Sequence, residues 1–179
     1  DWIHPDIPIF LSTGTKTLIE IANIFYPDSL QQPGMLNHSR CFEYWKQFTI
    51  GSFTITPYLI DHSAFGASFL LVEVEGKRIV YTGDIRGHGR KAKLFERMVK
   101  NPPKNIDCLI MEGTTMGGGH TKIFSDENEV EKCLFDVFAN QDDVSFVMAA
   151  GSNIDRTVSI YRAAKKAQKT LVLDLYQVY

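Results

Sequence analysis

The sequence predicts an α/β protein in two parts, and the order of its sequence patterns carries that prediction. Up to Thr82 the chain reads as antiparallel hairpins with one helix. After Lys91, helical and strand patterns alternate, which is typical of a parallel sheet with crossover helices. A glycine-rich stretch, Gly113–His120, interrupts the alternation. We therefore place the domain boundary there, with residues 1–113 in the first domain and residues 114–179 in the second.

The first part is predicted to contain one strand, one helix and two hairpins. The apolar run Ile7–Leu11 indicates a strand, and Thr15–Phe25 has apolar residues at helical spacing. Alternating patterns in Phe48–Ile50 and Phe53–Leu59, on either side of a Gly-Ser pair, predict the first hairpin. The second hairpin covers 67–82, with its turn at a Glu-Gly-Lys sequence.

After Lys91, on both sides of the predicted domain boundary, the chain is predicted to alternate helices and strands. Lys91–Val99 reads as a helix that ends before Asn-Pro-Pro, and Ile106–Met111 reads as a buried strand with Cys108 in the core. Asp126 and Glu129 have the spacing of a capping box at a helix start. The remaining predicted elements are the helix Ser125–Asn140, the strand Val144–Ala149, the helix Ile154–Ala167 and the strand Thr170–Leu175.

Composition and cysteine usage limit the class of protein. The chain is 44% hydrophobic and 22% charged, an ordinary globular balance. No apolar run is long enough to span a bilayer, so we expect no membrane partner. The three cysteines, Cys41, Cys108 and Cys133, are odd in number and far apart. This argues against a disulfide framework and favours a reducing, cytoplasmic location.

The charge distribution leaves two interpretations open. The net charge of −2 does not by itself indicate a nucleic-acid binder. Basic residues nevertheless concentrate between Arg86 and Lys104, and again between Arg156 and Lys169. Such segments attract phosphates, or they form the solvated face of a helix.

A histidine and an aspartate flank the second predicted hairpin. His62 comes just before its first strand, and Asp84 follows its second strand after Thr82-Gly83. Because the two arms have nearly equal length, the hairpin brings His62 and Asp84 together at one edge of the sheet. An imidazole and a carboxylate held there are suitable ligands for a hydrolytic metal. The alternative for Asp84 is plain turn chemistry after a strand.

Three motifs resemble those of a known family. His62, followed by the hairpin that ends in Thr-Gly-Asp84, resembles the third and fourth metal-binding motifs of the metallo-β-lactamase fold. The segment 106–114, Ile-Asp-Cys-Leu-Ile-Met-Glu-Gly-Thr, resembles the acidic motif that opens the β-CASP branch, which includes RNase J. The segment 152–156, Ser-Asn-Ile-Asp-Arg, resembles the Ser-Asn-x-x-Arg helix start of RNase J-like members.

The resemblance implies a fold and a metal centre. Residues 1–113 would be part of a metallo-β-lactamase-like αββα sandwich, and 114–179 the start of a β-CASP-like α/β domain. His62 would bind zinc, Asp84 would bridge two zinc ions, and Glu112 would orient a metal-binding histidine. A solvated glutamate at a strand end is the alternative for Glu112. The family's His-x-His-x-Asp-His motif is not in this sequence, so we expect a fragment that is inactive by itself.

The resemblance also implies a substrate. We expect a zinc-dependent phosphodiester hydrolase that acts on single-stranded RNA, with DNA as the alternative, and a homodimer is left open. Ser152, Arg156, Arg86 and Arg90 are the candidate phosphate contacts, and a plain helix cap with surface arginines is the alternative. His88 is not expected to be a ligand. The rival functions are hydrolysis of a small molecule on the same fold and a noncatalytic binding or scaffold role.

Overall fold

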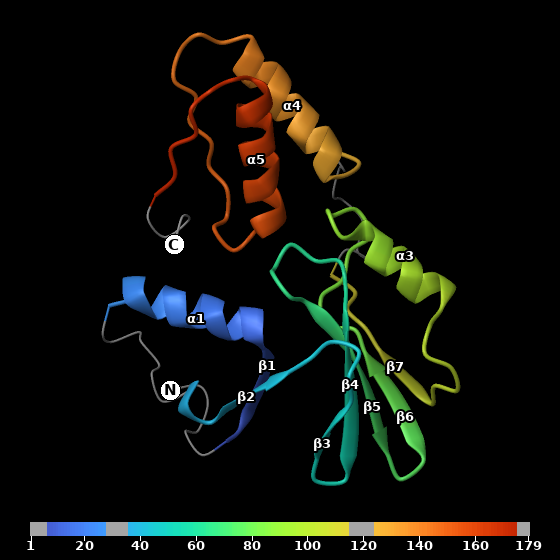
Figure 1. The fold of residues 1–179 in the computed structure, drawn as a ribbon. Helices are drawn as coiled ribbons and strands as arrows, with labels where there is room; N and C mark the ends of the chain where they lie inside the picture. The colour runs from blue at the N-terminus through green and yellow to red at the C-terminus, as the bar shows by residue number, and fades with distance from the viewer. Residues whose placement is uncertain (1–6, 28–35, 115–123, 175–179) are drawn as a thin grey trace.

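A five-stranded mixed sheet carries the main core of the computed structural model, which describes residues 7–27, 36–114 and 124–174 (Figure 1). The strands follow the order β3-β4-β5-β6-β7. β3 to β6 are antiparallel neighbours, and β7 pairs in parallel with β6. Their bounds are β3 Phe48–Ile50, β4 Phe53–Leu59, β5 Ser68–Val74, β6 Lys77–Tyr81 and β7 Cys108–Ile110. Both predicted hairpins, β3–β4 and β5–β6, are confirmed.

A smaller unit lies beside this sheet. β1 (Ile9–Ser12) pairs in parallel with β2 (Ser39–Phe42), and α1 (Thr13–Phe25) follows β1 directly. The Ser12 hydroxyl caps α1 by accepting a hydrogen bond of 3.1 Å from the Thr15 amide. β2 is not among the strands that the sequence pattern predicts. Its residues do not alternate in burial, so pairing with β1, rather than local pattern, makes it a strand.

The main core lies on the sheet. Ile60, Phe69, Leu71 and Val80 are buried together, and α3 (Ala92–Lys100) packs Phe95 and Met98 against them. The Phe69 ring stacks on Tyr58 with centroids 4.7 Å apart. This packing fixes the sheet edge at which β5 begins and β6 ends.

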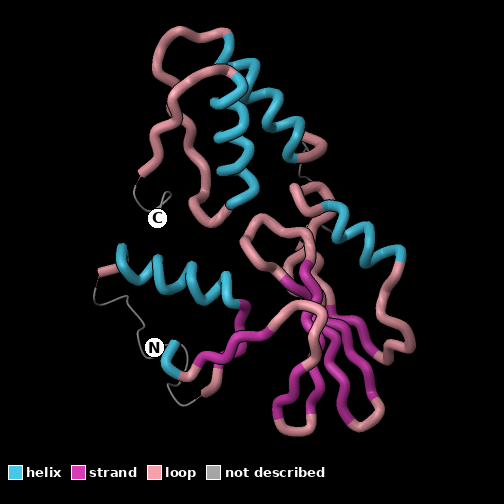
Figure 2. The backbone as a smooth tube through the Cα atoms, in the orientation of Figure 1, coloured by secondary structure: helices cyan, strands magenta, loops and turns pink. Residues whose placement is uncertain are grey.

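Two further helices form a pair above the sheet (Figures 1 and 2). α4 (Glu127–Ala139) and α5 (Ile154–Lys166) pack through Phe138, Ala163 and Ala164. The predicted cap at Asp126 is confirmed, since its carboxylate accepts from the amides of Asn128 and Glu129, both at 2.9 Å. The domain boundary stays a prediction, because residues 115–123 lie outside the described residues.

Two predicted strands are wrong in the part of the chain that the structure describes. The segments 144–149 and 170–174 carry no strand, and Figure 2 shows both as loops. Several of their apolar side chains remain open to solvent, with Phe146 95%, Met148 100% and Val172 85% exposed. A strand requires a neighbour that pairs its amides and carbonyls. The local sequence is typical of a strand, but no described segment pairs with either stretch.

The predicted burial of Cys108 is also wrong. β7 is the last strand of the sheet, and its three residues are all exposed. An apolar pattern predicts burial only where another layer covers the strand, and nothing described covers β7.

Among the described residues, no helix has both the length and the apolar content needed to cross a membrane.

Removing the Phe69 ring should destabilise the protein far more than removing an equally large exposed ring. Phe69 is 4% exposed, whereas Phe53 on β4 is 46% exposed. We expect Phe69→Ala to lower the free energy of unfolding by about 3–5 kcal/mol, and the matched control Phe53→Ala by about 1 kcal/mol or less. Urea denaturation followed by circular dichroism measures both. Equal losses would contradict the assigned core.

Candidate functional site

His62 and Asp84 lie next to each other at the open end of the β5–β6 hairpin. His62 Nε2 is 3.9 Å from Asp84 Oδ2, and the two side chains are 26% and 75% exposed. Gly83 precedes Asp84 with a φ of +57°, in the left-handed region that favours glycine. The expected proximity of His62 and Asp84 is therefore observed, whereas their role as metal ligands stays a prediction.

The His62 ring is oriented by the loop that follows it. Its Nδ1 accepts a hydrogen bond of 3.2 Å from the Ala64 amide. In a neutral imidazole one ring nitrogen accepts and the other carries the proton, so this contact leaves the proton on Nε2. Binding of a metal through Nε2 would move the proton to Nδ1, and the Ala64 contact would have to open.

Glu112 interacts with the backbone next to Asp84. Its Oε1 accepts a hydrogen bond of 2.5 Å from the Ile85 amide. This bond, a second from the Thr114 side chain and the nearby His62 imidazole lower the pKa of Glu112, although burial opposes the shift. Glu112 thus fixes the backbone just after Asp84. Its predicted role as the orienter of a metal-binding histidine stays a prediction.

The pair fits part of a zinc site and does not complete one. Imidazole nitrogen and carboxylate oxygen are zinc ligands, but a closed site needs four ligands and a catalytic site three from the protein. Among the described residues, no group of three or more His, Cys, Asp or Glu side chains could hold a metal. His88 contributes its backbone carbonyl to the Glu127 amide at 3.3 Å, and His4 lies outside the described residues.

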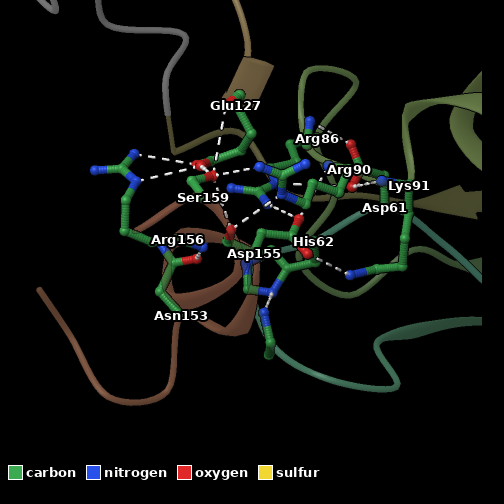
Figure 3. Close-up of polar contacts among 12 residues, drawn as sticks. Asp61, His62, Arg86, Arg90, Lys91, Glu127, Asn153, Asp155, Arg156 and Ser159 are labelled. Carbon is green, nitrogen blue, oxygen red and sulfur yellow. Dashed lines mark hydrogen bonds and ion pairs between the residues drawn. The ribbon is translucent and has the colours of Figure 1, made fainter. Parts of the chain in front are cut away.

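A network of buried charges joins the loop after Asp84 to α4 and α5 (Figure 3). We call it the ion-pair cluster. It comprises Asp61, Arg86, Arg90, Lys91, Glu127, Glu131, Asp155, Arg156 and Ser159. Most of these side chains come from three places: the 86–91 loop, the first turns of α4 and the first turns of α5.

Asp155 is the acceptor at the centre of the cluster, and it is only 5% exposed. Its carboxylate binds the Arg86 guanidinium, the Arg90 amide at 3.1 Å and the Lys91 ammonium at 3.2 Å. Its backbone carbonyl accepts from Arg90 Nε at 3.2 Å. One residue of α5 therefore contacts three residues of the loop.

Asp61 holds the same loop from below. It is fully buried, and its two oxygens accept from the Gly89 amide at 2.7 Å and the Lys91 amide at 3.2 Å. Arg86 Nε lies 3.8 Å from Asp61 Oδ1 and makes no hydrogen bond within the described residues. The residue beside His62 thus determines where the basic loop runs.

The outer arginines pair with glutamates of α4. Arg156 reaches both oxygens of Glu127, at 3.1 and 3.2 Å, and Ser159 donates to the same carboxylate at 2.7 Å. Arg90 binds Glu131 at 2.7 Å. Burial opposes ionisation of Glu127 and Glu131, yet the pKa of each lies below its usual value. The cause is the Arg156 and Ser159 bonds at Glu127, and the Lys166 and Arg90 bonds at Glu131.

The structure places three of the predicted phosphate contacts inside this network. Arg86, Arg90 and Arg156 all face carboxylates, so a phosphate would have to displace an internal partner. Ser152 is exposed, and Asn153 is the residue whose side chain caps α5, accepting from the Arg156 amide at 3.0 Å. Substrate contact by these four residues stays a prediction.

The acidic half of the cluster was missed from sequence. Asp155 and Ser159, like Glu127 and Glu131, are four residues apart and so share one helix face. Each pair continues the apolar stripe that packs α4 on α5. Polar residues on the core stripe of both helices, together with a basic loop elsewhere in the sequence, could have indicated a buried ion-pair network.

Comparison with known proteins supports the fold and leaves the site open. No family model matches the chain. A crystal structure of a protein of unknown function from Enterococcus faecalis V583 matches 98% of this chain with a TM-score of 0.80 and 20% identity. The chain spans 43% of that protein's length. This likeness shows a shared mixed α/β fold and nothing about activity.

A second solved structure is much less similar. Zinc-bound PqqB from Methylobacterium extorquens matches 60% of this chain and 33% of its own length, with 15% identity. Its TM-score of 0.39 is too low to support an argument about this protein.

Removing the central carboxylate should weaken the fold. Asp155→Asn keeps the shape but leaves Lys91 without its anion and Arg86 with only the 3.8 Å contact to Asp61. Because breaking a buried ion pair strands its partners, we expect a loss of about 3–5 kcal/mol in the free energy of unfolding. Asp136→Asn, an exposed aspartate on α4, is the matched control, with a change within about 0.5 kcal/mol. Urea denaturation at neutral pH tests this, and similar stabilities would contradict the role of Asp155.

Acid should destabilise the protein through the cluster. Glu127 and Glu131 have pKa values lowered by folding, so the unfolded chain binds more protons than the folded one near the ordinary glutamate pKa of about 4.3. The stabilisation is full above that pKa and is lost as pH falls through the folded pKa values. Urea denaturation from pH 7 to pH 3 should show this decline. Glu127→Gln should flatten it, whereas Glu96→Gln, exposed on α3, should leave it unchanged.

Proposed function

We propose that this chain is part of a zinc-dependent phosphodiester hydrolase that acts on single-stranded RNA. The observation that carries the proposal is the 3.9 Å approach of His62 and Asp84 at the open end of a rigid hairpin. The resemblance of the flanking sequence to metallo-β-lactamase and β-CASP motifs supports the same assignment. The coarser conclusion, a mixed α/β fold, rests on the sheet topology and on the structural comparison.

Each residue of the pair has a defined role in this proposal. His62 would hold one metal through Nε2, and Asp84 would offer its exposed carboxylate to two. Glu112 would keep the Asp84 backbone in place through the Ile85 amide. Zinc, when bound, supplies a Lewis acid and a water of lowered pKa, about 7 instead of 15.7. The further ligands would have to come from outside the described residues.

The basic loop has a second role in this proposal. Arg86 and Arg90 follow Asp84 closely, and Arg156 is the most accessible of the paired arginines, with 35% of its side chain exposed. A polyanion that approaches the hairpin edge would compete with Glu127 for Arg156. Contacts of this kind track the phosphate backbone and do not depend on sequence.

Loss of the proposed bridging carboxylate should abolish hydrolysis. The test uses the longer protein to which this chain is expected to belong, with zinc and either single-stranded RNA or a bis-aryl phosphate. We expect Asp84→Asn to reduce both rates to background, because a neutral amide cannot bridge two cations. Glu112→Gln should cost about 10–100-fold, as changes next to metal ligands do. Asp107→Asn, at the turn end of the β5–β6 hairpin, is the control, and parental rates for Asp84→Asn would refute the proposal.

The 179-residue chain by itself should bind zinc weakly. Two protein ligands leave the metal far short of the about 10–16 kcal/mol of closed structural zinc sites. Calorimetric titration should give weak binding that His62→Ala removes. Tight, stoichiometric zinc binding with His62 and Asp84 as the protein ligands would contradict this.

The substrate class is tested with the longer protein. If it cleaved the bis-aryl phosphate but neither bound nor cleaved RNA, a small-molecule hydrolase would replace the RNA enzyme as the proposed function.

A further inference from the structure

An aromatic hollow lies beside the loop that carries His62. Its volume is about 480 Å³, within the range of pockets that take small ligands. The walls come from the start of α1, the residues after β2, the His62 loop and the start of α3. The residues that matter here are Gly14, Phe42, Tyr44, Trp45, Phe65 and Lys91.

The frame of this hollow is fixed by close contacts. The Tyr44 hydroxyl donates to the Gly66 carbonyl at 2.8 Å. Gly66 has a φ of +71°, and a Cβ there would stand 2.7 Å from the Tyr44 oxygen. The Phe65 ring lies so close to Gly14 that a Cβ on Gly14 would be 2.4 Å from it. The aromatic wall and the His62 loop therefore form one rigid unit.

Two aromatic rings in this wall remain open to solvent. Trp45 is 48% exposed and Phe65 is 53% exposed. The Trp45 backbone is held in the left-handed region, with a φ of 63°, and its amide donates to the Pro57 carbonyl at 2.7 Å. A bulky residue in that region is strained, and such strain concentrates at binding sites. Exposed aromatic faces of this kind are the platforms on which nucleobases stack.

The charges around the hollow suit an anionic ligand. Lys91 is among its lining residues, and the Lys91 ammonium contacts Asp155 at 3.2 Å. The first turn of α1 carries no acidic residue. Glu43, the acid in the wall, pairs with Lys46 at 2.6 Å. An aromatic wall with a cation at its side matches a base linked to a phosphate better than an apolar peptide.

We propose that this hollow binds a nucleobase of a single-stranded nucleic acid, with Trp45 and Phe65 as the stacking surfaces. The identity of the ligand rests on the proposed function. Phe65 is three residues from His62, so the bound base would belong to a nucleotide adjacent to the phosphate at the His62–Asp84 pair. The hollow would then position the strand, whereas the metals would cleave it.

The test measures binding without metal. The 179-residue chain is titrated calorimetrically in EDTA with a pentamer of adenylate RNA and with an abasic pentamer of the same backbone. Loss of base stacking should weaken the abasic strand about 5- to 150-fold. With Trp2→Phe leaving Trp45 as the tryptophan, the adenylate strand should quench fluorescence saturably. Equal affinity for the two strands would overturn the proposal, as would binding of an apolar peptide in their place.

A variant separates stacking from simple packing. Phe65→Leu keeps an aliphatic side chain on Gly14 but removes the aromatic face. It should lose most of the preference for adenylate over abasic RNA while its affinity for the abasic strand stays unchanged. Phe53→Ala, an equally exposed ring on β4, is the control and should keep the preference. An unchanged preference in Phe65→Leu would overturn the assignment.

The two proposals fail separately. Base-dependent binding without any zinc-dependent hydrolysis in the longer protein would leave the nucleobase site standing and reject the hydrolase. Hydrolysis of RNA with no preference for bases over an abasic strand would do the reverse.

Discussion

The buried carboxylate of Asp155 is the contact on which the arrangement of this protein depends. It lies on α5 and holds the Arg86, Arg90 and Lys91 loop that follows Asp84 directly. The Asp61 carboxylate holds the same loop by accepting hydrogen bonds from two of its backbone amides. Burying such charges carries a desolvation penalty, which the opposite charges and hydrogen bonds around Asp155 offset. The loop is therefore fixed in one position, and with it the edge of the sheet where His62 and Asp84 meet.

This constraint links the His62–Asp84 pair to the helix pair above it. Glu112 fixes Ile85, the cluster fixes 86–91, and Asp61 stands next to His62 in the chain. A displacement of α5 would consequently move the 86–91 loop, and Asp84 lies only two residues before that loop. Arg86, Arg90 and Lys91 hold the loop on the helix pair. Under the proposed function, a polyanion that bound Arg86 or Arg90 would therefore also change the contacts that position the helices.

The His62 loop serves two neighbouring surfaces at once. On one side, His62 faces Asp84. On the other, Phe65 and Gly66 rest on α1 and Tyr44. Because one short loop contributes to both, a nucleic-acid strand bound in the aromatic hollow as proposed would have its backbone beside the His62–Asp84 pair. A rigid loop of this kind positions a ligand without a large rearrangement, which reduces the entropic cost of binding.

The sequence by itself determined the two hairpins, the helices and the meeting of His62 with Asp84, because period-two patterns and equal arm lengths are local properties of the chain. Tertiary structure alone decided the rest. Segments 144–149 and 170–174 have strand-like sequences but no described neighbour to pair with, and Cys108 is apolar but uncovered. The partners of Arg86 and Arg156 come from residues about 70 and 30 positions away. The polar residues on the core stripes of α4 and α5 indicate that buried partners are needed, but only the folded chain shows which basic residues supply them.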